Sequence, residues 1–197
     1  MKTLISTNLA QSVKAQQAFA AAAGDRIVQL VEWLIETFQG GGKLMVFGNG
    51  GSAADAQHMA AEFVNRFKIS RRPLPAIALT TDSSVLTSIG NDFGYDLVFV
   101  KQIEALGKPG DLALAISTSG NSPNVVKAVE TAREMGIRTV ALTGGTVRPG
   151  GALGPLVDLL LNVPADSTPH IQETHIWVEH VVCELVEREM FGDSRAA

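Results

Sequence analysis

Polar side chains with the spacing of a catalytic or metal site occur in a helix-like stretch in the first third of the chain. His58 and Glu62 are four residues apart, so their side chains share one helix face, and Asp55 lies one turn earlier on nearly the same face. Such a set can hold a metal ion or place a base beside an acid. The alternative is a hydrogen-bonding pair on the surface. A functional site is favoured because a glycine-rich loop of the phosphate-binding type, residues 48–52, directly precedes this helix.

A second set of polar residues lies in the helix-like segment 169–190, which is otherwise apolar. Gln172, Glu173 and His180 interrupt a run of valine, isoleucine and tryptophan, and a buried or half-buried polar group needs a partner. We interpret the two other histidines of this segment, His170 and His175, as surface or packing residues.

Two loops of glycine and hydroxyl residues each follow a short apolar run and precede a helix-like stretch. The first is Gly-Asn-Gly-Gly-Ser at 48–52, and the second is Ser-Thr-Ser-Gly-Asn-Ser at 117–122. The backbone N–H groups, hydroxyl donors and positive dipole end of such a helix start form a cradle for an anion, most simply a phosphate. Two of these loops in one domain predict a phosphorylated small molecule bound across the carboxyl edge of a sheet.

The first loop also satisfies the G-x-G-x-x-G/A pattern of dinucleotide-binding proteins, through Gly48, Gly50 and Ala53. Such a site needs an acidic residue about 20 residues further on, at the end of the next strand. The first acidic residue after the apolar run 75–79 is Asp82, which is too far along, and the 117–122 loop has no role in that scheme. A nicotinamide or flavin site is therefore disfavoured, and the lack of a G-K-[ST] sequence argues against a nucleoside-triphosphate loop.

Strand-like and helix-like segments alternate along the chain. The expected strands are 43–47, 75–79, 112–116, 138–142 and 157–163, and the expected helices are 52–67, 83–90, 95–106, 122–135 and 169–190. Most of the strand segments are apolar at consecutive positions, as in strands covered on both faces. The alternation predicts an α/β fold with a doubly wound, mainly parallel five-stranded sheet flanked by helices.

The N-terminal part of the chain is expected to form a helical hairpin. Residues 4–22 and 25–38 are both helix-like, and the three glycines at 40–42 end the second segment. We expect this hairpin, within residues 1–40, and the sheet core with its closing helix, at 41–197, to form one domain. The apolar surface of the hairpin and of the closing helix predicts a homotetramer.

The composition disfavours several classes of protein. A net charge of −4 and a pI near 5.5 argue against a general nucleic-acid surface, and we interpret the basic cluster Lys68, Arg71 and Arg72 as a solvated loop. Cys183 is the only cysteine, so no intrachain disulfide can form and a reducing compartment is expected. The sequence has no uncharged apolar run of membrane-spanning length and begins without a secretory signal pattern. We therefore expect a cytoplasmic protein.

Five motifs occur in order between about residues 27 and 190: GNGGSAADAQHMAAEF, LPAIALTTD, IGNDFGYD, ISTSGNSPNV and TPHIQETHIWVEH. Together they resemble the phosphoheptose isomerases of the sugar isomerase (SIS) domain superfamily. The resemblance implies conversion of sedoheptulose 7-phosphate to D-glycero-D-manno-heptose 7-phosphate, the first step toward bacterial ADP-heptose and lipopolysaccharide heptose. It also implies a cytoplasmic homotetramer with one Zn²⁺ per subunit, active sites at subunit boundaries, and no nucleic-acid or membrane partner.

The resemblance also implies roles for individual residues. Glu62 matches the catalytic base, His180 the acid, and Asp55 a further acidic residue of the pocket. The zinc ligands fall on His58, Glu62, Gln172 and His180. The substrate contacts fall on Asn49, Gly50, Gly51, Ser52, Glu62, Asn91, Asp92, Ser117, Thr118, Ser119, Ser122 and Gln172. On one unbroken helix, Gln172 and His180 are separated by about 12 Å of rise, so either both reach toward a point between them or they serve sites in different subunits.

The residue types also suit aldose–ketose isomerisation. One carboxylate can move a proton between C1 and C2 through an enediol, while an acid or a metal ion steadies the oxygen that gains charge. The main alternative from another class is a non-catalytic SIS-domain scaffold that assists a replication-initiation protein, but the presence of all four expected zinc ligands favours catalysis. A sugar-sensing regulator would need a helix-turn-helix domain, which this sequence lacks. A third alternative is that the protein is another sugar-phosphate isomerase of the superfamily, with a different substrate.

Overall fold

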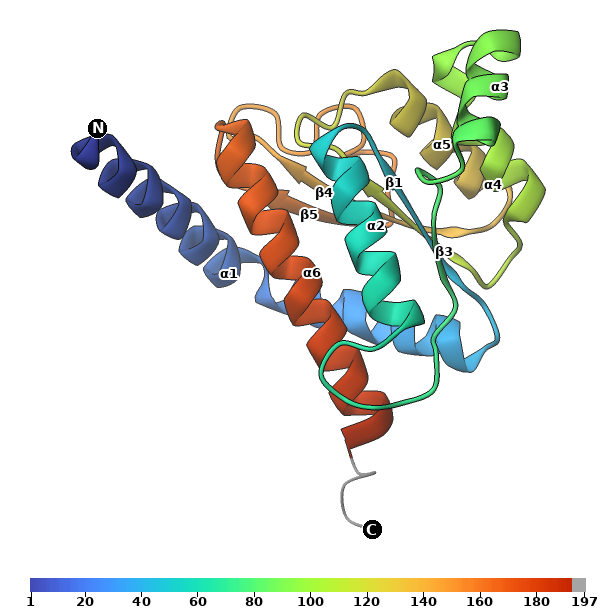
Figure 1. Cartoon of the computed structure of the whole chain (residues 1–197), viewed down its shortest axis with the longest axis horizontal. Helices are drawn as coiled ribbons and strands as arrows, with labels where there is room; N and C mark the ends of the chain where they lie inside the picture. Colours follow the sequence, from blue (N-terminus) through green and yellow to red (C-terminus); the bar gives the residue numbers. More distant parts are fainter. Residues whose placement is uncertain (193–197) are drawn as a thin grey trace.

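The structure, a computed structural model, describes residues 1–192, which form a β-sheet enclosed by helices (Figure 1). The helices are α1 (Lys2–Gln39), α2 (Gly51–Val64), α3 (Ser83–Phe93), α4 (Val100–Leu106), α5 (Pro123–Glu134) and α6 (Thr168–Phe191), with a short 3-10 helix, η1 (Tyr95–Leu97). The strands are β1 (Leu44–Gly48), β2 (Ala76–Ala78), β3 (Leu112–Ile116), β4 (Arg138–Gly144) and β5 (Leu159–Val163). All five predicted strands are present.

The strands form one sheet in the order β2-β1-β3-β4-β5, and every neighbouring pair is parallel. In register, Leu44 of β1 pairs with Leu112 of β3, which pairs in turn with Arg138 of β4. The predicted doubly wound α/β fold is therefore confirmed, with a sheet that is parallel throughout. After β1 the chain adds β2 on one side and then returns to add β3 on the other, so the strand order reverses between β1 and β3.

Each central strand buries side chains on both faces of the sheet. Val46 and Leu114 pack toward α1, α2 and α6, whereas Phe47 and Ala115 pack toward α4 and α5. Burial on both faces explains why consecutive strand positions are apolar. On the first of these faces α2 and α6 lie side by side (Figure 1), and these two helices carry most of the charged candidate residues.

The predicted N-terminal hairpin is wrong, because residues 2–39 form one continuous helix. The buried residues Phe19, Ala23 and Ile27 keep their helical spacing through Gly24, so the apolar stripe continues where a turn was expected. Gly24 does not have the positive φ of a turn glycine, and a helical glycine costs only about 1 kcal/mol relative to alanine. The first turns of α1 project beyond the body of the protein (Figure 1).

The predicted helix 95–106 is divided into η1 and α4. Val98 and Phe99 lie between the two and are 0% and 1% exposed. The division follows the hydrogen bonds: the Val98 N–H donates to the Tyr95 carbonyl three residues back, whereas the Ile103 N–H donates to the Phe99 carbonyl four residues back. Within residues 1–192, no helix combines the length and the apolarity that a bilayer span needs.

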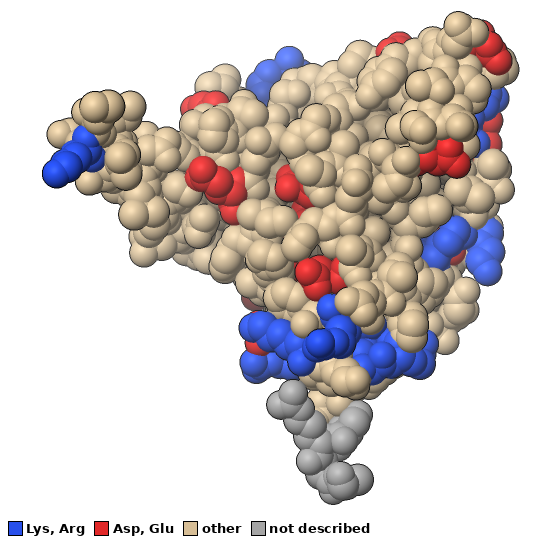
Figure 2. All heavy atoms as spheres, in the orientation of Figure 1, with Lys and Arg blue, Asp and Glu red and all other residues tan. Residues whose placement is uncertain are grey.

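The basic cluster lies in the loop 65–75 between α2 and β2, near the end of α6. Figure 2 shows lysine and arginine side chains gathered along this lower edge of the molecule. Lys68 and Arg72 are exposed there, as expected of a solvated loop. The expectation is wrong for Arg71, whose side chain is only 1% exposed and is paired with Glu187.

We expect Gly24→Ala to stabilise the protein by about 1 kcal/mol, because alanine is the better helix former and an added Cβ would meet no atom within 4 Å. Urea unfolding midpoints would measure the change. Gly41→Ala is the matched control: its Cβ also meets nothing within 4 Å, but Gly41 has φ +75°, so alanine there should destabilise by about 1 kcal/mol. Equal losses at both positions would contradict a helix that runs through Gly24.

Candidate functional site

The two glycine and hydroxyl loops meet at the carboxyl edge of the sheet. The 48–52 loop follows β1 and begins α2, and the 117–122 loop follows β3 and precedes α5. Since the strand order reverses between β1 and β3, the loops flank the crevice in which doubly wound α/β proteins bind their ligands. No side chain caps the N-terminus of α2 or α5, so no side chain competes with an anion for the positive dipole end of either helix.

A pair of asparagines ties the two loops together. The Asn49 side-chain amide donates to Asn124 Oδ1 and the Asn124 amide donates to Asn49 Oδ1, both at 2.9 Å. The Tyr95 hydroxyl also donates to Asn49 Oδ1, at 3.3 Å, and so joins η1 to the first loop. Sequence reasoning missed Asn124, because an asparagine in the first turn of a helix gives no sign of a partner 75 residues away.

Hydroxyl groups of the second loop gather at the start of α5. Ser117 Oγ and Ser122 Oγ are 3.4 Å apart, and Thr118 and Ser119 line a cavity of about 210 Å³. Gly120 has φ +65°, and a Cβ there would overlap the backbone of the loop after β4, so only glycine suits this turn. The loop therefore presents the four predicted hydroxyls from a constrained backbone.

Three of the predicted charged residues are brought together by α2 and α6. His58 Nε2 lies 2.9 Å from His180 Nε2 and 3.6 Å from Glu62 Oε1. The Phe67 ring stacks on the His180 ring, with centroids 5.5 Å apart and planes 13° apart. Burial, and next the charge of His58, lowers the pKa of His180 from its ordinary value, which favours a neutral imidazole.

These three side chains have donor atoms that suit a zinc ion. Two unprotonated ring nitrogens 2.9 Å apart repel each other unless a proton or a cation lies between them. Ligand atoms around tetrahedral zinc are about 3.4 Å apart, and the separations of 2.9 and 3.6 Å bracket that value. Among residues 1–192 there is no group of three or more histidine, cysteine, aspartate or glutamate side chains already arranged to hold a metal ion. The donors fit the ion in type, and His58 lies at a ligand-like separation from both His180 and Glu62.

Gln172, the fourth predicted ligand, lies at the first loop instead. A Cβ at Gly51 would be 2.4 Å from Gln172 Nε2, so the amide packs against the glycine that begins α2. Gln172 and His180 are on the unbroken helix α6, separated by about 12 Å along its axis. Within one chain, the structure brings Gln172 to the predicted substrate loop and not to His58 and His180.

Asp55 and Glu179 form an acidic pair near the histidines. Both Glu179 oxygens and Asp55 Oδ2 are buried and have no hydrogen-bond partner among the described residues. Burial, partly offset by His58, raises the pKa of Asp55 to about 6, and burial, with the nearby Asp55, raises the pKa of Glu179 to about 9. Glu179 is therefore neutral at pH 7. Sequence reasoning missed it, because a glutamate in a long helix is typical of a solvent-facing position.

His170 and His175 are buried and belong to the packing of α6. His175 is 0% exposed, and its Nε2 donates to the Thr143 carbonyl oxygen at 3.0 Å. Burial lowers the pKa of His175 to about 4, so this ring is a neutral structural group. His170 Nδ1 lies 3.2 Å from Glu173. The packing interpretation is right for both histidines, and the surface interpretation is wrong.

Asn91 and Asp92 lie at the exposed end of α3, where the Asn91 amide donates to Asp92 Oδ1 at 2.8 Å. The next element, η1, reaches the first loop through Tyr95. Among the described contacts, none joins Asn91 or Asp92 to the histidines of α2 and α6.

Comparison with known proteins finds relatives along nearly the whole chain. A family model described as the SIS domain matches residues 9–144. The phosphoheptose isomerase of Geotalea daltonii is 50% identical over 182 residues, which cover 92% of this chain and 93% of that protein. Solved phosphoheptose isomerase structures from Neisseria gonorrhoeae and Francisella tularensis have TM-scores of 0.88 and 0.90 at 43% and 38% identity, covering 94% and 95% of this chain and 98% and 100% of theirs.

Proposed function

Because the chain belongs to the phosphoheptose isomerases, a family built on the SIS domain, we propose that it converts sedoheptulose 7-phosphate to D-glycero-D-manno-heptose 7-phosphate. The protein is thus a sugar-phosphate isomerase. One observation supports the proposed chemistry above all: His58 lies within 3.6 Å of Glu62 on its own helix and within 2.9 Å of His180 on α6, so all three side chains are close together. Neither the fold nor the comparisons favour the non-catalytic scaffold.

In the proposed reaction Glu62 is the base and His180 the acid. The Glu62 carboxylate removes a proton from C1 of the ketose while His180 donates a proton to O2, which gives the enediol. Glu62 then returns a proton to C2 and His180 accepts the proton of O1, which completes the aldose. A neutral imidazole can both donate and accept, and the lowered pKa of His180 supports this role. Asp55 is proposed as a further acidic residue of the pocket.

The two loops are proposed to hold the substrate. The uncapped N-terminus of α5 and the hydroxyls of the second loop support phosphate binding there, and the first loop with Gln172 would contact the sugar. Holding the phosphate also keeps the enediol from eliminating it. The proposed phosphate contacts are Ser117, Thr118, Ser119 and Ser122. The proposed sugar contacts are Asn49, Gly50, Gly51, Ser52, Asn91, Asp92 and Gln172.

We further propose that the resident metal is Zn²⁺, held by His58, Glu62 and His180, with Gln172 as the fourth family ligand. When bound, the ion would polarise a substrate oxygen. At a free concentration 100 times its dissociation constant, zinc should stabilise the protein by about 2.7 kcal/mol, a rise in Tm of roughly 5–10 °C relative to protein in chelator. Thermal unfolding with and without zinc would measure it.

His58→Ala should remove most of that zinc-dependent rise, because it deletes one imidazole donor. His170→Ala is the matched control: it removes another histidine of the chain, one bonded to Glu173, and should keep the wild-type difference between zinc and chelator. A wild-type zinc shift in His58→Ala would contradict the proposed ligand set.

We also propose a cytoplasmic homotetramer with active sites at subunit boundaries. The projecting part of α1 supports assembly, because Leu4, Ile5 and Leu9 are 72%, 69% and 64% exposed there, and exposed apolar patches of this kind mark interaction sites. Static light scattering of the purified protein at micromolar concentration is expected to give four times the chain mass. A stable, active monomer would contradict the assembly and the shared site.

Glu62→Gln tests the catalytic proposal itself. Glutamine keeps nearly the same shape but cannot accept a proton, so kcat for sedoheptulose 7-phosphate should fall by at least about 10²-fold. The loops that hold the substrate are unchanged, and substrate binding measured by calorimetry should stay near wild type. Glu104→Gln, which neutralises an exposed glutamate paired with Lys101, should retain wild-type turnover. Near-normal turnover by Glu62→Gln would mean that another group is the base.

A further inference from the structure

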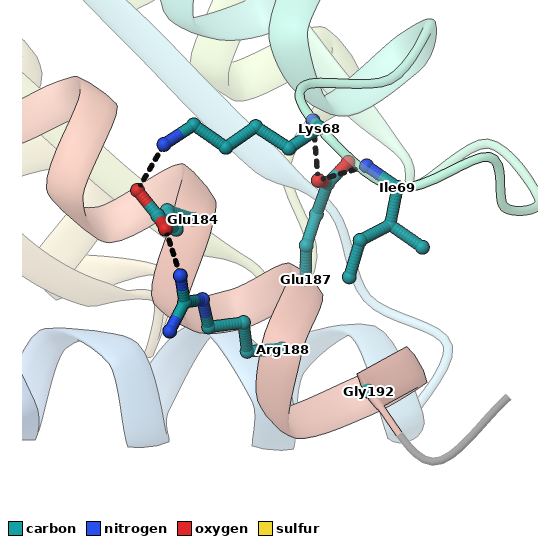
Figure 3. Close-up of a pocket in the computed structure, with 6 residues that line it drawn as sticks. All are labelled: Lys68, Ile69, Glu184, Glu187, Arg188 and Gly192. Carbon is teal, nitrogen blue, oxygen red and sulfur yellow. Dashed lines mark hydrogen bonds and ion pairs between the residues drawn. The ribbon is translucent and has the colours of Figure 1, made fainter. Parts of the chain in front are cut away.

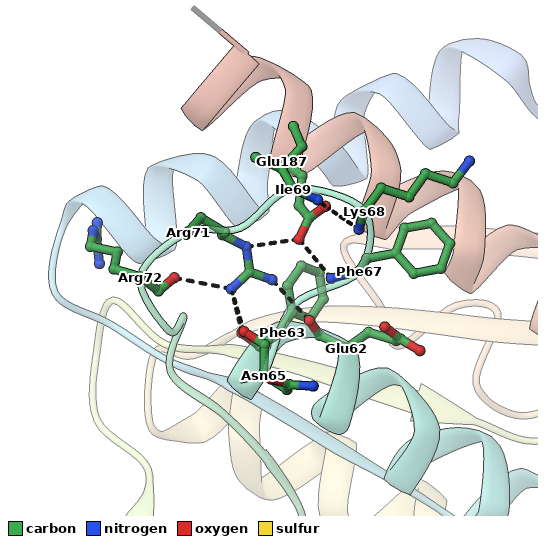
Figure 4. A network of polar contacts seen from close by, with 9 residues as sticks. All are labelled: Glu62, Phe63, Asn65, Phe67, Lys68, Ile69, Arg71, Arg72 and Glu187. Atoms are coloured by element: carbon green, nitrogen blue, oxygen red, sulfur yellow. Dashed lines mark hydrogen bonds and ion pairs between the residues drawn. The ribbon is translucent and has the colours of Figure 1, made fainter. Parts of the chain in front are cut away.

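Arg71 lies in the 65–75 loop, and its buried side chain packs against the C-terminal end of α2, the helix that carries Glu62. Its guanidinium donates to the backbone carbonyl oxygens of Glu62 and Phe63, both at 2.8 Å, and of Asn65 at 3.3 Å. Figure 4 shows the guanidinium among these carbonyls at the last turn of α2. The last carbonyls of a helix have no partner within the helix, so Arg71 supplies the donors that fix this turn.

Glu187 on α6 is the ionic partner of Arg71. Its Oε1 lies 2.9 Å from Arg71 Nε, and both side chains are 1% exposed. The same carboxylate accepts hydrogen bonds from the N–H groups of Phe67, Lys68 and Ile69, at 2.7, 2.7 and 2.9 Å. Burial would raise the pKa of Glu187, but the three N–H donors and Arg71 outweigh it and hold that pKa below its ordinary value.

A cavity of about 440 Å³ lies beside this carboxylate, between the 65–75 loop and the end of α6. Figure 3 shows the Glu187 carboxylate pointing to the backbone of Lys68 and Ile69, while the Lys68 side chain reaches Glu184. The loop is therefore attached to α6 through its backbone at three consecutive residues. Glu187 fixes the path of this loop, which determines where the Phe67 side chain lies.

The network joins the three segments that surround the proposed acid and base. Arg71 binds the carbonyl of Glu62 itself. Phe67, held by Glu187 through its N–H, stacks on the His180 ring at 5.5 Å with planes 13° apart. Glu187 follows His180 by seven residues, two turns along α6, so both point from one side of that helix.

We propose that Arg71 and Glu187 are positioning residues for the isomerisation, acting on Glu62 through the last turn of α2 and on His180 through the stacked ring of Phe67. This inference rests on the proposed function of Glu62 and His180. An ion pair alone would accept lysine. The Arg71 guanidinium makes five contacts in different directions, counting one to the Arg72 backbone carbonyl at 3.0 Å, and these require the planar fork of an arginine. Small displacements of reacting groups are costly to rate, up to about 10²-fold for 1 Å.

Arg71→Lys tests the proposal while keeping the charge opposite Glu187. We expect kcat to fall by about 10- to 100-fold, with KM changed by less than about threefold, because the substrate loops are untouched. The His180 ring protons, assigned by their loss in His180→Gln, should move downfield in the ¹H NMR spectrum as the Phe67 ring current is lost. The chain has only four histidines, which makes the assignment practical.

Arg72→Lys is the matched control, since Arg72 is the next residue and donates none of these hydrogen bonds through its side chain; it should keep wild-type kcat and the wild-type His180 signal. Phe67→Leu is a second variant, in case Arg71→Lys unfolds. It keeps an apolar side chain and the N–H bond to Glu187, but should move the His180 signal downfield and lower kcat by roughly tenfold.

Wild-type kcat and His180 signal in a folded Arg71→Lys would overturn the positioning role. Reduced kcat with an unmoved His180 signal in both Arg71→Lys and Phe67→Leu would overturn the route through the stacked ring. The two proposals fail differently: full turnover by Glu62→Gln would refute the proposed function, whereas an inactive Glu62→Gln beside a fully active Arg71→Lys would refute only the positioning role.

Discussion

The reversal of strand order between β1 and β3 is the constraint on which the rest of the site depends. Because these neighbours are parallel, the loops that follow them must meet at one edge of the sheet, where Asn49 and Asn124 fasten them together. The first loop also begins α2, which must cross the face on which α6 packs. The strand order thus determines both the anion cradle and the approach of His58 to His180.

The sheet was predictable because burial on both faces leaves a signal at every strand position. Runs such as 112–116 could not be half-exposed, and the small residues after them marked the carboxyl edge. The N-terminal hairpin was not predictable in the same way. Whether a helix ends at Gly24 depends on how well Phe19 and Ile27 pack against the rest of the fold, and local propensity contains no information on that packing.

Within the candidate site, sequence reasoning succeeded where partners are close along the chain and failed where they are distant. The spacing of His58 and Glu62 predicts a shared helix face, and the structure has them 3.6 Å apart. Arg71 depends on Glu187, more than 100 residues away, and Glu179 on Asp55. A single buried polar residue with a remote partner produces no periodic pattern, so only the structure distinguishes Arg71 from its exposed neighbour Arg72.

The central claim is that the Glu62 carboxylate carries a proton between C1 and C2 of the sugar. Its side chain is 20% exposed, so the proton that it holds can exchange with water before it is returned. The most direct measurement is turnover of sedoheptulose 7-phosphate in deuterated water, followed by ¹H NMR of the aldose product. The account predicts deuterium at C2. Deuterium incorporated at C2 by the Glu62→Gln variant at the wild-type rate would contradict it, because another group would then carry the proton.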